Sequence, residues 1–319
     1  MSVAATDRHS RPGACSVIWD SARASALGTA PVATFWVALE QNGPWGAKAA
    51  TQSHLDPQVG MALESSCRDA GGRFILIRRP GAHVAREGGQ QRVYLAGGLA
   101  TRPWLLQADL EDPAPLVRLP WAELTEGHLT AVQRTVPDFE QSPAPVLLVC
   151  ANSRRDTCCA VRGRPVSLES SSRRPGQVWE CSHTGGHRFA PTGLLLPHGQ
   201  AFARLSGPSA VLAVDAATRD EVPAELLGMA YDRGRSHLTP PAQAAESTVR
   251  QQIQEPSLLA LSTSAARQPE RDNAWRCRVS HVDGRHWDVV AVRESGGEDR
   301  PESCGKPAVP PWAWDCTVD

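Results

Sequence analysis

Apolar residues in the first part of the chain follow two periods, one typical of strands and one typical of helices. Short apolar runs predict three strands, at residues 32–39, 74–77 and 92–95. Between the first two runs, apolar residues recur at helical spacing after Asp56 and Pro57, which favour the cap and the first position of a helix. Gly71 and Gly72 then end that predicted helix.

The same order of elements returns further along the chain. Residues 146–149 form a continuous apolar run, as expected of a strand buried on both faces, and residues 157–172 and 177–181 predict a helix and a second strand. Residues 193–199 and 201–205 predict a hairpin, followed by one helix over 215–229 and another that begins after Thr239 and ends before Pro256. Strand, helix, strand, hairpin and helix is the order of a thioredoxin-like domain.

The last part of the chain predicts a second hairpin. Two alternating runs, at residues 275–282 and 286–292, are separated by Asp283 and Gly284, the strongest short-range hairpin signal. The last 27 residues are rich in Pro, Gly and charge, so we expect them to wrap the surface with little structure.

These elements predict an α/β fold with two thioredoxin-like halves, a C-terminal β-hairpin and an irregular tail. Residues 135–145 hold several prolines and little hydrophobic pattern, which makes them the best candidate for a linker. The expected organisation is an N-terminal thioredoxin-like half over residues 15–135, which lacks candidate ligands, a second thioredoxin-like domain over 140–258, and a hairpin and tail over 259–319.

Composition narrows the class of protein. The chain has 319 residues, with 41% hydrophobic and 21% charged residues and a formal net charge of −1, which does not indicate a nucleic-acid-binding surface. No apolar run approaches the roughly 20 residues needed to span a bilayer. The N-terminus lacks the apolar segment of a signal peptide, so the expected location is the cytoplasm. In that compartment clustered cysteines more often indicate metal or redox chemistry than structural disulfides.

Candidate chemistry is concentrated in one segment. Cys150 and Cys159 enclose eight residues, and His183 and His187 enclose three. Two thiolates and two imidazoles make a four-ligand set that suits an iron–sulfur cluster with mixed ligands, or zinc. Gly185 and Gly186 between the histidines favour a loop in which the backbone passes close to a cofactor.

The neighbouring residues admit more than one interpretation. Cys158 is an alternative to Cys159 as a ligand, and otherwise a buried residue of the helix. Cys181 is interpreted as core, and the remaining cysteines as isolated buried or tail residues. His198 and His237 are interpreted as surface or structural residues. The Arg154-Arg155-Asp156 stretch is either an internal ion pair that shapes the loop or a basic rim that contacts cluster sulfides or an acidic partner.

The two segments together resemble the sucrase/ferredoxin-like family. The resemblance is carried by Cys150-x8-Cys159 with Arg154-Arg155-Asp156 inside it, by residues 182–190 around the histidines, and more weakly by residues 43–46, 231–236 and 243–246. It implies a 2Fe–2S cluster held by Cys150, Cys159, His183 and His187 in a thioredoxin-like fold. Some relatives carry a His where this chain has Asn152. The "sucrase" part of the name is not supported here, because no paired glycosidase carboxylates stand out.

This ligand set predicts the redox behaviour. Two ferric ions, two sulfides, two thiolates and two neutral imidazoles sum to zero charge, whereas four thiolates would leave the oxidised cluster at −2. A neutral cluster accepts an electron more easily, as in Rieske centres, and an iron-bound imidazole can couple electron uptake to proton uptake.

The leading hypothesis is therefore an electron-transfer protein, more an electron carrier than a stand-alone enzyme. The alternatives are a zinc protein that uses the same ligands and a clusterless thioredoxin-like thiol oxidoreductase. Zinc sites usually pair cysteines at shorter spacing, and the chain lacks a Cys-x-x-Cys motif. No Gly-x-Gly-x-x-Gly follows a predicted strand and no P-loop is present, so electrons are expected from an unidentified external redox partner.

Overall fold

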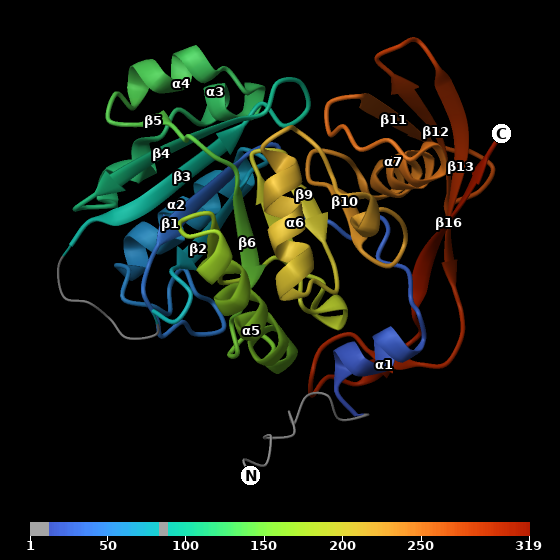
Figure 1. Ribbon diagram of the computed structural model, residues 1–319, viewed down its shortest axis with the longest axis horizontal. Helices are drawn as coiled ribbons and strands as arrows, with labels where there is room; N and C mark the ends of the chain where they lie inside the picture. The colour runs from blue at the N-terminus through green and yellow to red at the C-terminus, as the bar shows by residue number, and fades with distance from the viewer. Residues whose placement is uncertain (1–12, 83–88) are drawn as a thin grey trace.

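The computed structural model describes residues 13–82 and 89–319. The N-terminal stretch judged above for a signal peptide lies outside them. The main feature of the fold is a mixed sheet of ten strands, in the order β10-β9-β8-β6-β7-β2-β1-β3-β4-β5, with helices packed against it (Figure 1). The predicted α/β class is confirmed. Within the described residues, none of the helices combines the length and apolar character needed to cross a bilayer.

The two halves of this sheet have the same topology. In the first half β1 pairs with β2 in parallel and with β3 antiparallel, and β3 pairs with β4 antiparallel. In the second half β6, β7, β8 and β9 repeat those pairings in the same order. The predicted order of strand, helix, strand and hairpin is thus present twice.

The elements of the first half are β1 (Trp36–Glu40), α2 (Pro57–Asp69), β2 (Arg73–Arg78), β3 (Gln91–Gly97), β4 (Trp104–Leu110), η1 (Ala114–Arg118), α3 (Trp121–Glu126), α4 (Leu129–Thr135) and β5 (Glu140–Gln141). Asp56 caps α2, as predicted, because its carboxylate accepts hydrogen bonds from the N–H groups of Gln58 and Val59. The first strand begins four residues later than predicted. The proposed linker contributes β5, a short edge strand paired with β4.

The elements of the second half are β6 (Val146–Cys150), α5 (Thr157–Arg173), β7 (Val178–Cys181), η2 (His187–Phe189), β8 (Gly193–Leu196), β9 (Gln200–Phe202), α6 (Gly207–Ala217), η3 (Ala224–Leu226) and β10 (Asp232–Arg235). The helix predicted over residues 215–229 is wrong in position. Ser206 forms a capping box with Ser209 that starts α6 earlier, and Pro223 interrupts the segment that was expected to be helical.

The halves join where β2 meets β7 in an antiparallel pair, with Ile77 opposite Cys181 and Arg78 opposite Glu180. Arg78 and Glu180 form a buried ion pair at 2.8 Å across this junction. Removing one partner of such a pair typically costs about 3–5 kcal/mol, because the other buried charge loses its counter-ion. An apolar cluster also runs across both halves and includes Trp36, Leu148 and Trp179.

The C-terminal part forms a second sheet in the order β11-β12-β13-β16, packed against α7. Its elements, with those of the segment that leads into β16, are α7 (Pro240–Ile253), β11 (Leu261–Arg267), β12 (Ala274–His281), β13 (His286–Ser295), β14 (Arg300–Pro301), β15 (Ala308–Val309) and β16 (Trp312–Val318). The predicted Asp283-Gly284 hairpin is confirmed. The expectation of an irregular tail is wrong for β16, which pairs with β13 along its whole length.

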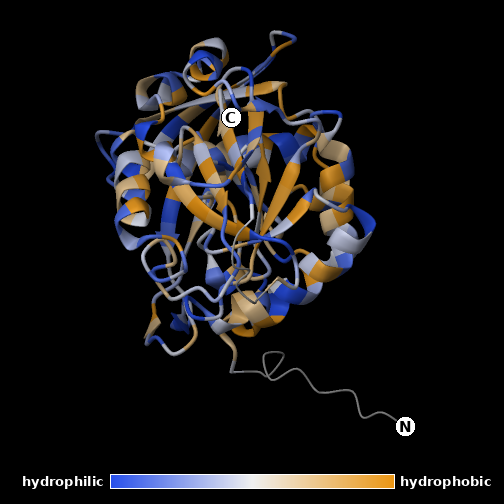
Figure 2. Cartoon of the chain, turned by 90° about the vertical axis from the view of Figure 1, so that its left-hand side faces the viewer, coloured by the Kyte–Doolittle hydropathy of each residue, from blue (hydrophilic) through white to orange (hydrophobic). Residues whose placement is uncertain are grey.

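The central strands are the most hydrophobic part of the molecule, whereas the surrounding helices and loops mix polar and apolar residues (Figure 2). A short N-terminal helix, α1 (Cys15–Ser21), lies beside the tail strand β14. The N-terminal helix thus meets the segment that precedes β15 and β16, and it also contacts η2 of the second half, a contact that becomes important at the site.

Candidate metal centre

Three elements of the second half bring the four candidate ligands together. Cys150 is the last residue of β6, Cys159 lies in the first turn of α5, and both histidines follow β7. Because β6 and β7 are parallel and Cys150 lies opposite Cys181, both strands end at the same edge of the sheet, where α5 begins.

Gly163 allows α5 to approach β6 this closely. A Cβ at position 163 would lie 2.2 Å from the Cys150 carbonyl oxygen, so a larger residue would push the helix away. The approach places the first turn of α5, and with it Cys159, directly beside the end of β6.

The side chains converge. Cys159 Sγ lies 3.2 Å from His187 Nδ1, and the rings of His183 and His187 are stacked with centroids 4.7 Å apart. The Cys150 thiol makes side-chain hydrogen bonds with Cys159 and His183. Both thiols are fully buried, whereas both imidazoles are partly exposed. The four predicted ligands are therefore neighbours, and the ligand atoms of Cys159, His187 and Asp156 all lie within 4.8 Å of one another.

The pKa shifts of Cys150 and His187 favour their metal-binding forms, whereas that of Cys159 favours the protonated thiol. The hydrogen bond with Cys159 is the main cause that holds the pKa of Cys150 well below its ordinary value, and the same bond, with burial, raises the pKa of Cys159. Burial, followed by the neighbouring His183, lowers the pKa of His187. A thiolate at Cys150 and a neutral imidazole at His187 are the forms that bind metals.

Arg233 supports the histidine loop from below. Its buried guanidinium donates hydrogen bonds to the carbonyl oxygen of Gly185 at 3.2 Å, to Thr29 Oγ1 at 3.1 Å and to the Thr29 carbonyl. Burial lowers the pKa of Arg233 to about 9, and the charges of Cys150 and Cys159 oppose that shift. The guanidinium is thus a buried cation whose charge interacts with both thiols.

Arg233 also explains the glycine pair. Gly186 has φ +71°, and a Cβ there would lie 2.6 Å from Arg233 Nη2. The close approach that the glycines permit is therefore to Arg233. Residues 231–236 were noted in the sequence only as a weak motif, because nothing in their spacing relates Arg233 to the histidines.

Asn152 connects the ligand loop to the first half. Its side-chain amide donates to the Gly46 carbonyl at 3.0 Å, and its oxygen accepts from the Arg154 N–H at 3.1 Å. Trp45 beside Gly46 stacks under Arg78, with the guanidinium carbon 4.1 Å from the ring centroid. Asn152 is thus a structural contact to the motif at residues 43–46.

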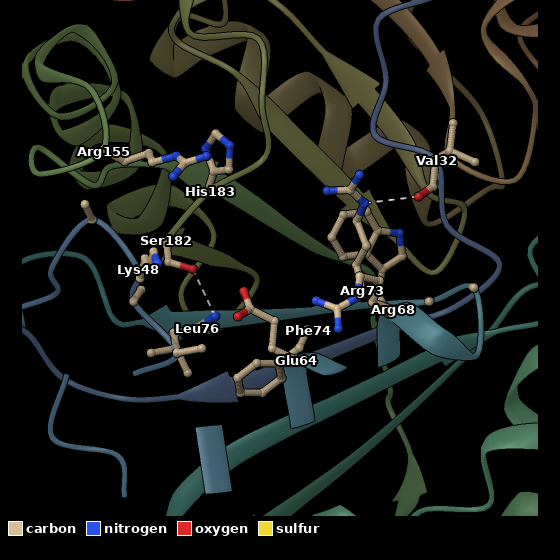
Figure 3. A pocket seen from close by; sticks show the side chains of 16 residues that line it. Val32, Lys48, Glu64, Arg68, Arg73, Phe74, Leu76, Arg155, Ser182 and His183 are labelled. Atoms are coloured by element: carbon tan, nitrogen blue, oxygen red, sulfur yellow. Dashed lines mark hydrogen bonds between the residues drawn. The ribbon is translucent and has the colours of Figure 1, made fainter. Parts of the chain in front are cut away.

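Asp156 and Arg155 have separate roles. Asp156 caps α5, because its Oδ1 accepts from the Cys158 N–H at 2.8 Å, while its Oδ2 accepts from Ser303 Oγ and the Cys304 N–H. Arg155 is exposed and lines a cavity of about 530 Å³ together with His183 (Figure 3). The first half supplies three further cations to this cavity, from Lys48, Arg68 and Arg73, and one carboxylate from Glu64.

Cys158 points away from the four candidate ligands. Its sulfur lies 2.9 Å from Cys304 Sγ and 3.5 Å from Cys15 Sγ. The interpretation of Cys15 and Cys304 as isolated residues is therefore wrong. Sequence reasoning missed this group because its members are separated by 143 or more residues. Cys181 is buried in the sheet, as expected of a core residue.

A known family matches the part of the chain that holds this site. The family model described as "Sucrase/ferredoxin-like" matches residues 27–227, which is more than half of the chain. The chain belongs to the sucrase/ferredoxin-like family. Membership points to a redox role, and the matched stretch contains all four candidate ligands, whereas Cys15 and Cys304 lie outside it. No curated protein and no solved structure gave a significant match to the chain.

Proposed function

We propose that this protein is an electron carrier that binds a 2Fe–2S cluster through Cys150, Cys159, His183 and His187. The observation that carries the proposal is the convergence of these four side chains from three elements. The donor set fits the group, because soft thiolates and imidazoles are the ligands that iron–sulfur centres use. When bound, such a cluster takes up and passes on single electrons.

The protein's own residues prepare the site for that role. Burial excludes water from the two thiols, and the buried cation of Arg233 offsets their negative charge. Arg233 and Asn152 hold the two ligand loops through hydrogen bonds to backbone carbonyls. The ligand positions are thus fixed by partners that are themselves buried.

The histidines are placed for exchange with solvent. His183 and His187 are each partly exposed, in contrast to the buried cysteines. The ring nitrogen that does not serve as a ligand is then available to gain or lose a proton. We therefore expect the midpoint potential to depend on pH, since negative charge added at the centre raises the basicity of a nearby imidazole.

The cationic cavity beside His183 favours docking of an anionic partner. Four cationic side chains and one carboxylate surround an opening that reaches an imidazole edge (Figure 3). Such a cationic surface attracts an acidic redox protein, and docking there would bring that protein next to His183. We propose that an acidic external partner docks here and exchanges electrons through the His183 edge.

Metal analysis of anaerobically purified protein tests the proposal. We expect about two irons and two acid-labile sulfides per chain, and an electron paramagnetic resonance signal on reduction. Zinc at these four ligands, without iron, would favour the zinc protein. Absence of any metal there would favour a thiol oxidoreductase.

A further inference from the structure

Three cysteines from distant parts of the chain form a second cluster. Cys15, Cys158 and Cys304 have sulfur–sulfur distances of 3.5, 3.4 and 2.9 Å, so each touches the other two. An oxygen of Asp156 completes the group, and all four potential ligand atoms lie within 4.8 Å of one another. The group is separate from Cys150 and His183.

Other contacts hold the three segments in place around this cluster. Cys158 sits in the first turn of α5, Cys15 begins α1, and Cys304 lies in the segment between β14 and β15. Trp19 Nε1 donates to the Pro301 carbonyl at 3.0 Å, which ties α1 to the tail. Asp156 Oδ2 accepts from the Cys304 N–H at 2.9 Å, which ties the tail to α5. The sulfurs are therefore preorganised.

The distances favour a single metal ion over other uses of three thiols. A disulfide has sulfurs about 2.05 Å apart and would leave the third thiol without a partner. A tetrahedral zinc ion with bonds of about 2.3 Å places its thiolates about 3.8 Å apart, so a small expansion of this triangle would admit one ion. Cluster ligands are spread over several irons, whereas sulfurs in mutual contact can share only one ion.

We propose that Cys15, Cys158, Cys304 and Asp156 bind a structural zinc ion. Each thiol releases its proton on binding, and three thiolates with one carboxylate form a closed, sulfur-rich site of the kind zinc prefers. The ion clamps the N-terminal helix and the C-terminal tail onto α5. Two of its three cysteines lie outside the family-matched residues, so the site joins the family-matched core to segments that the family model does not cover.

The zinc site adjoins the first centre through Asp156. The same carboxylate lies within reach of Cys159 and His187, and its Oδ1 caps the helix that carries Cys159. Tail attachment and the position of Cys159 are therefore mechanically connected. The presence of the second site does not depend on which metal occupies the first.

Elemental analysis and zinc X-ray absorption of the full-length protein test this inference. We expect about one zinc ion per chain with three sulfur ligands, in the wild type and in a Cys150→Ser/His187→Ala variant. In Cys304→Ser the zinc content should fall to near zero. Cys316→Ser is the matched control, because Cys316 is also a partly buried thiol of the tail but lies outside the cluster, and it should retain the zinc.

Three results would overturn the inference. One is wild-type protein, purified with zinc in the medium, that contains none. Another is zinc whose absorption spectrum shows two sulfur and two nitrogen ligands and which disappears in Cys150→Ser/His187→Ala. The third is a Cys158–Cys304 disulfide detected by mass spectrometry in zinc-free protein. The wild-type spectrum decides the ligand set even if Cys304→Ser fails to fold.

Discussion

Cys158 and Cys159 are adjacent in the chain, but their sulfurs belong to different groups. Cys159 contacts His187, whereas Cys158 contacts Cys304. Successive residues of a helix point about 100° apart, so one turn of α5 can serve two sites. Asp156 at the cap of that turn lies within 4.8 Å of the ligand atoms of both groups.

Because the two sulfurs belong to different groups, we expect substitution of each cysteine to remove a different metal. Cys159→Ser should abolish or gravely destabilise the proposed iron–sulfur cluster, because it removes a buried candidate ligand. Cys158→Ser should retain the iron and lose the zinc. Iron, sulfide and zinc analysis of the two purified variants checks this. Loss of iron in Cys158→Ser with retention in Cys159→Ser would reverse the ligand assignment.

Replacing a histidine ligand should change the potential more than the iron content. His183→Cys keeps a soft ligand but adds negative charge, so the midpoint potential should fall. In the wild type the midpoint should also decrease as pH rises, by up to about 59 mV per unit for one proton per electron. Redox titration over a range of pH measures both effects. A wild-type midpoint that is flat from acid to alkaline pH would contradict proton coupling at the imidazoles.

The glycines offer a matched pair of variants for the histidine loop. Gly186→Ala should disrupt the loop, because the new Cβ meets Arg233 at 2.6 Å as well as straining a positive φ. Gly176→Ala has a similar φ of +77° but meets nothing within 4 Å, so it carries only the strain of about 1–2 kcal/mol. Cluster content should therefore fall in the first variant only. Equal loss in both would show that Arg233 contact is unimportant.

The cationic cavity should control the rate of electron exchange. Arg155→Glu should slow oxidation of the reduced protein by anionic hexacyanoferrate(III) several-fold and spare or speed oxidation by cationic hexaammineruthenium(III). The exposed neighbour Arg154 lines a different cavity, so Arg154→Glu is the control for net charge. Stopped-flow measurements at low and high salt check this. Equal effects of both variants would place the docking surface elsewhere.

His237 should make the protein sensitive to acid. Burial, helped by the charge of Arg235, lowers its pKa from 6.5 to about 4. Between these values the unfolded chain binds a proton that the folded protein excludes, so stability is lost as pH falls through this window, by at most about 3 kcal/mol. Urea unfolding of His237→Gln should show a weaker pH dependence over this range. His286→Gln, at an exposed histidine, should behave as the wild type.

Local signals were sufficient for much of the fold. Asp56 with Pro57, and Asp283 with Gly284, specify a cap and a turn within a few residues, so α2 and the β12–β13 hairpin were predicted well. Strand β16 was missed because its pairing with β13 depends on a distant partner and not on its own pattern. Helix α6 was misplaced because the capping box at Ser206 was not recognised.

At the candidate site, too, residues close in sequence could be predicted and contacts between distant segments could not. The spacing of Cys150, Cys159, His183 and His187 was readable because all four lie within 38 residues. Arg233 and the contacts of Cys15 and Cys304 were not readable, since only the folded chain brings them near α5. Tertiary contacts between remote segments leave no periodic pattern in a single sequence.

The junction between β2 and β7 limits how this protein can be divided. Cutting the chain near residue 140 would uncover β7 along an apolar, unpaired edge and would leave Glu180 without Arg78. Such an edge is a template for association with other chains. A fragment that carries all four ligands would therefore tend to aggregate or to dimerise through β7, with a second copy in the place of the first half.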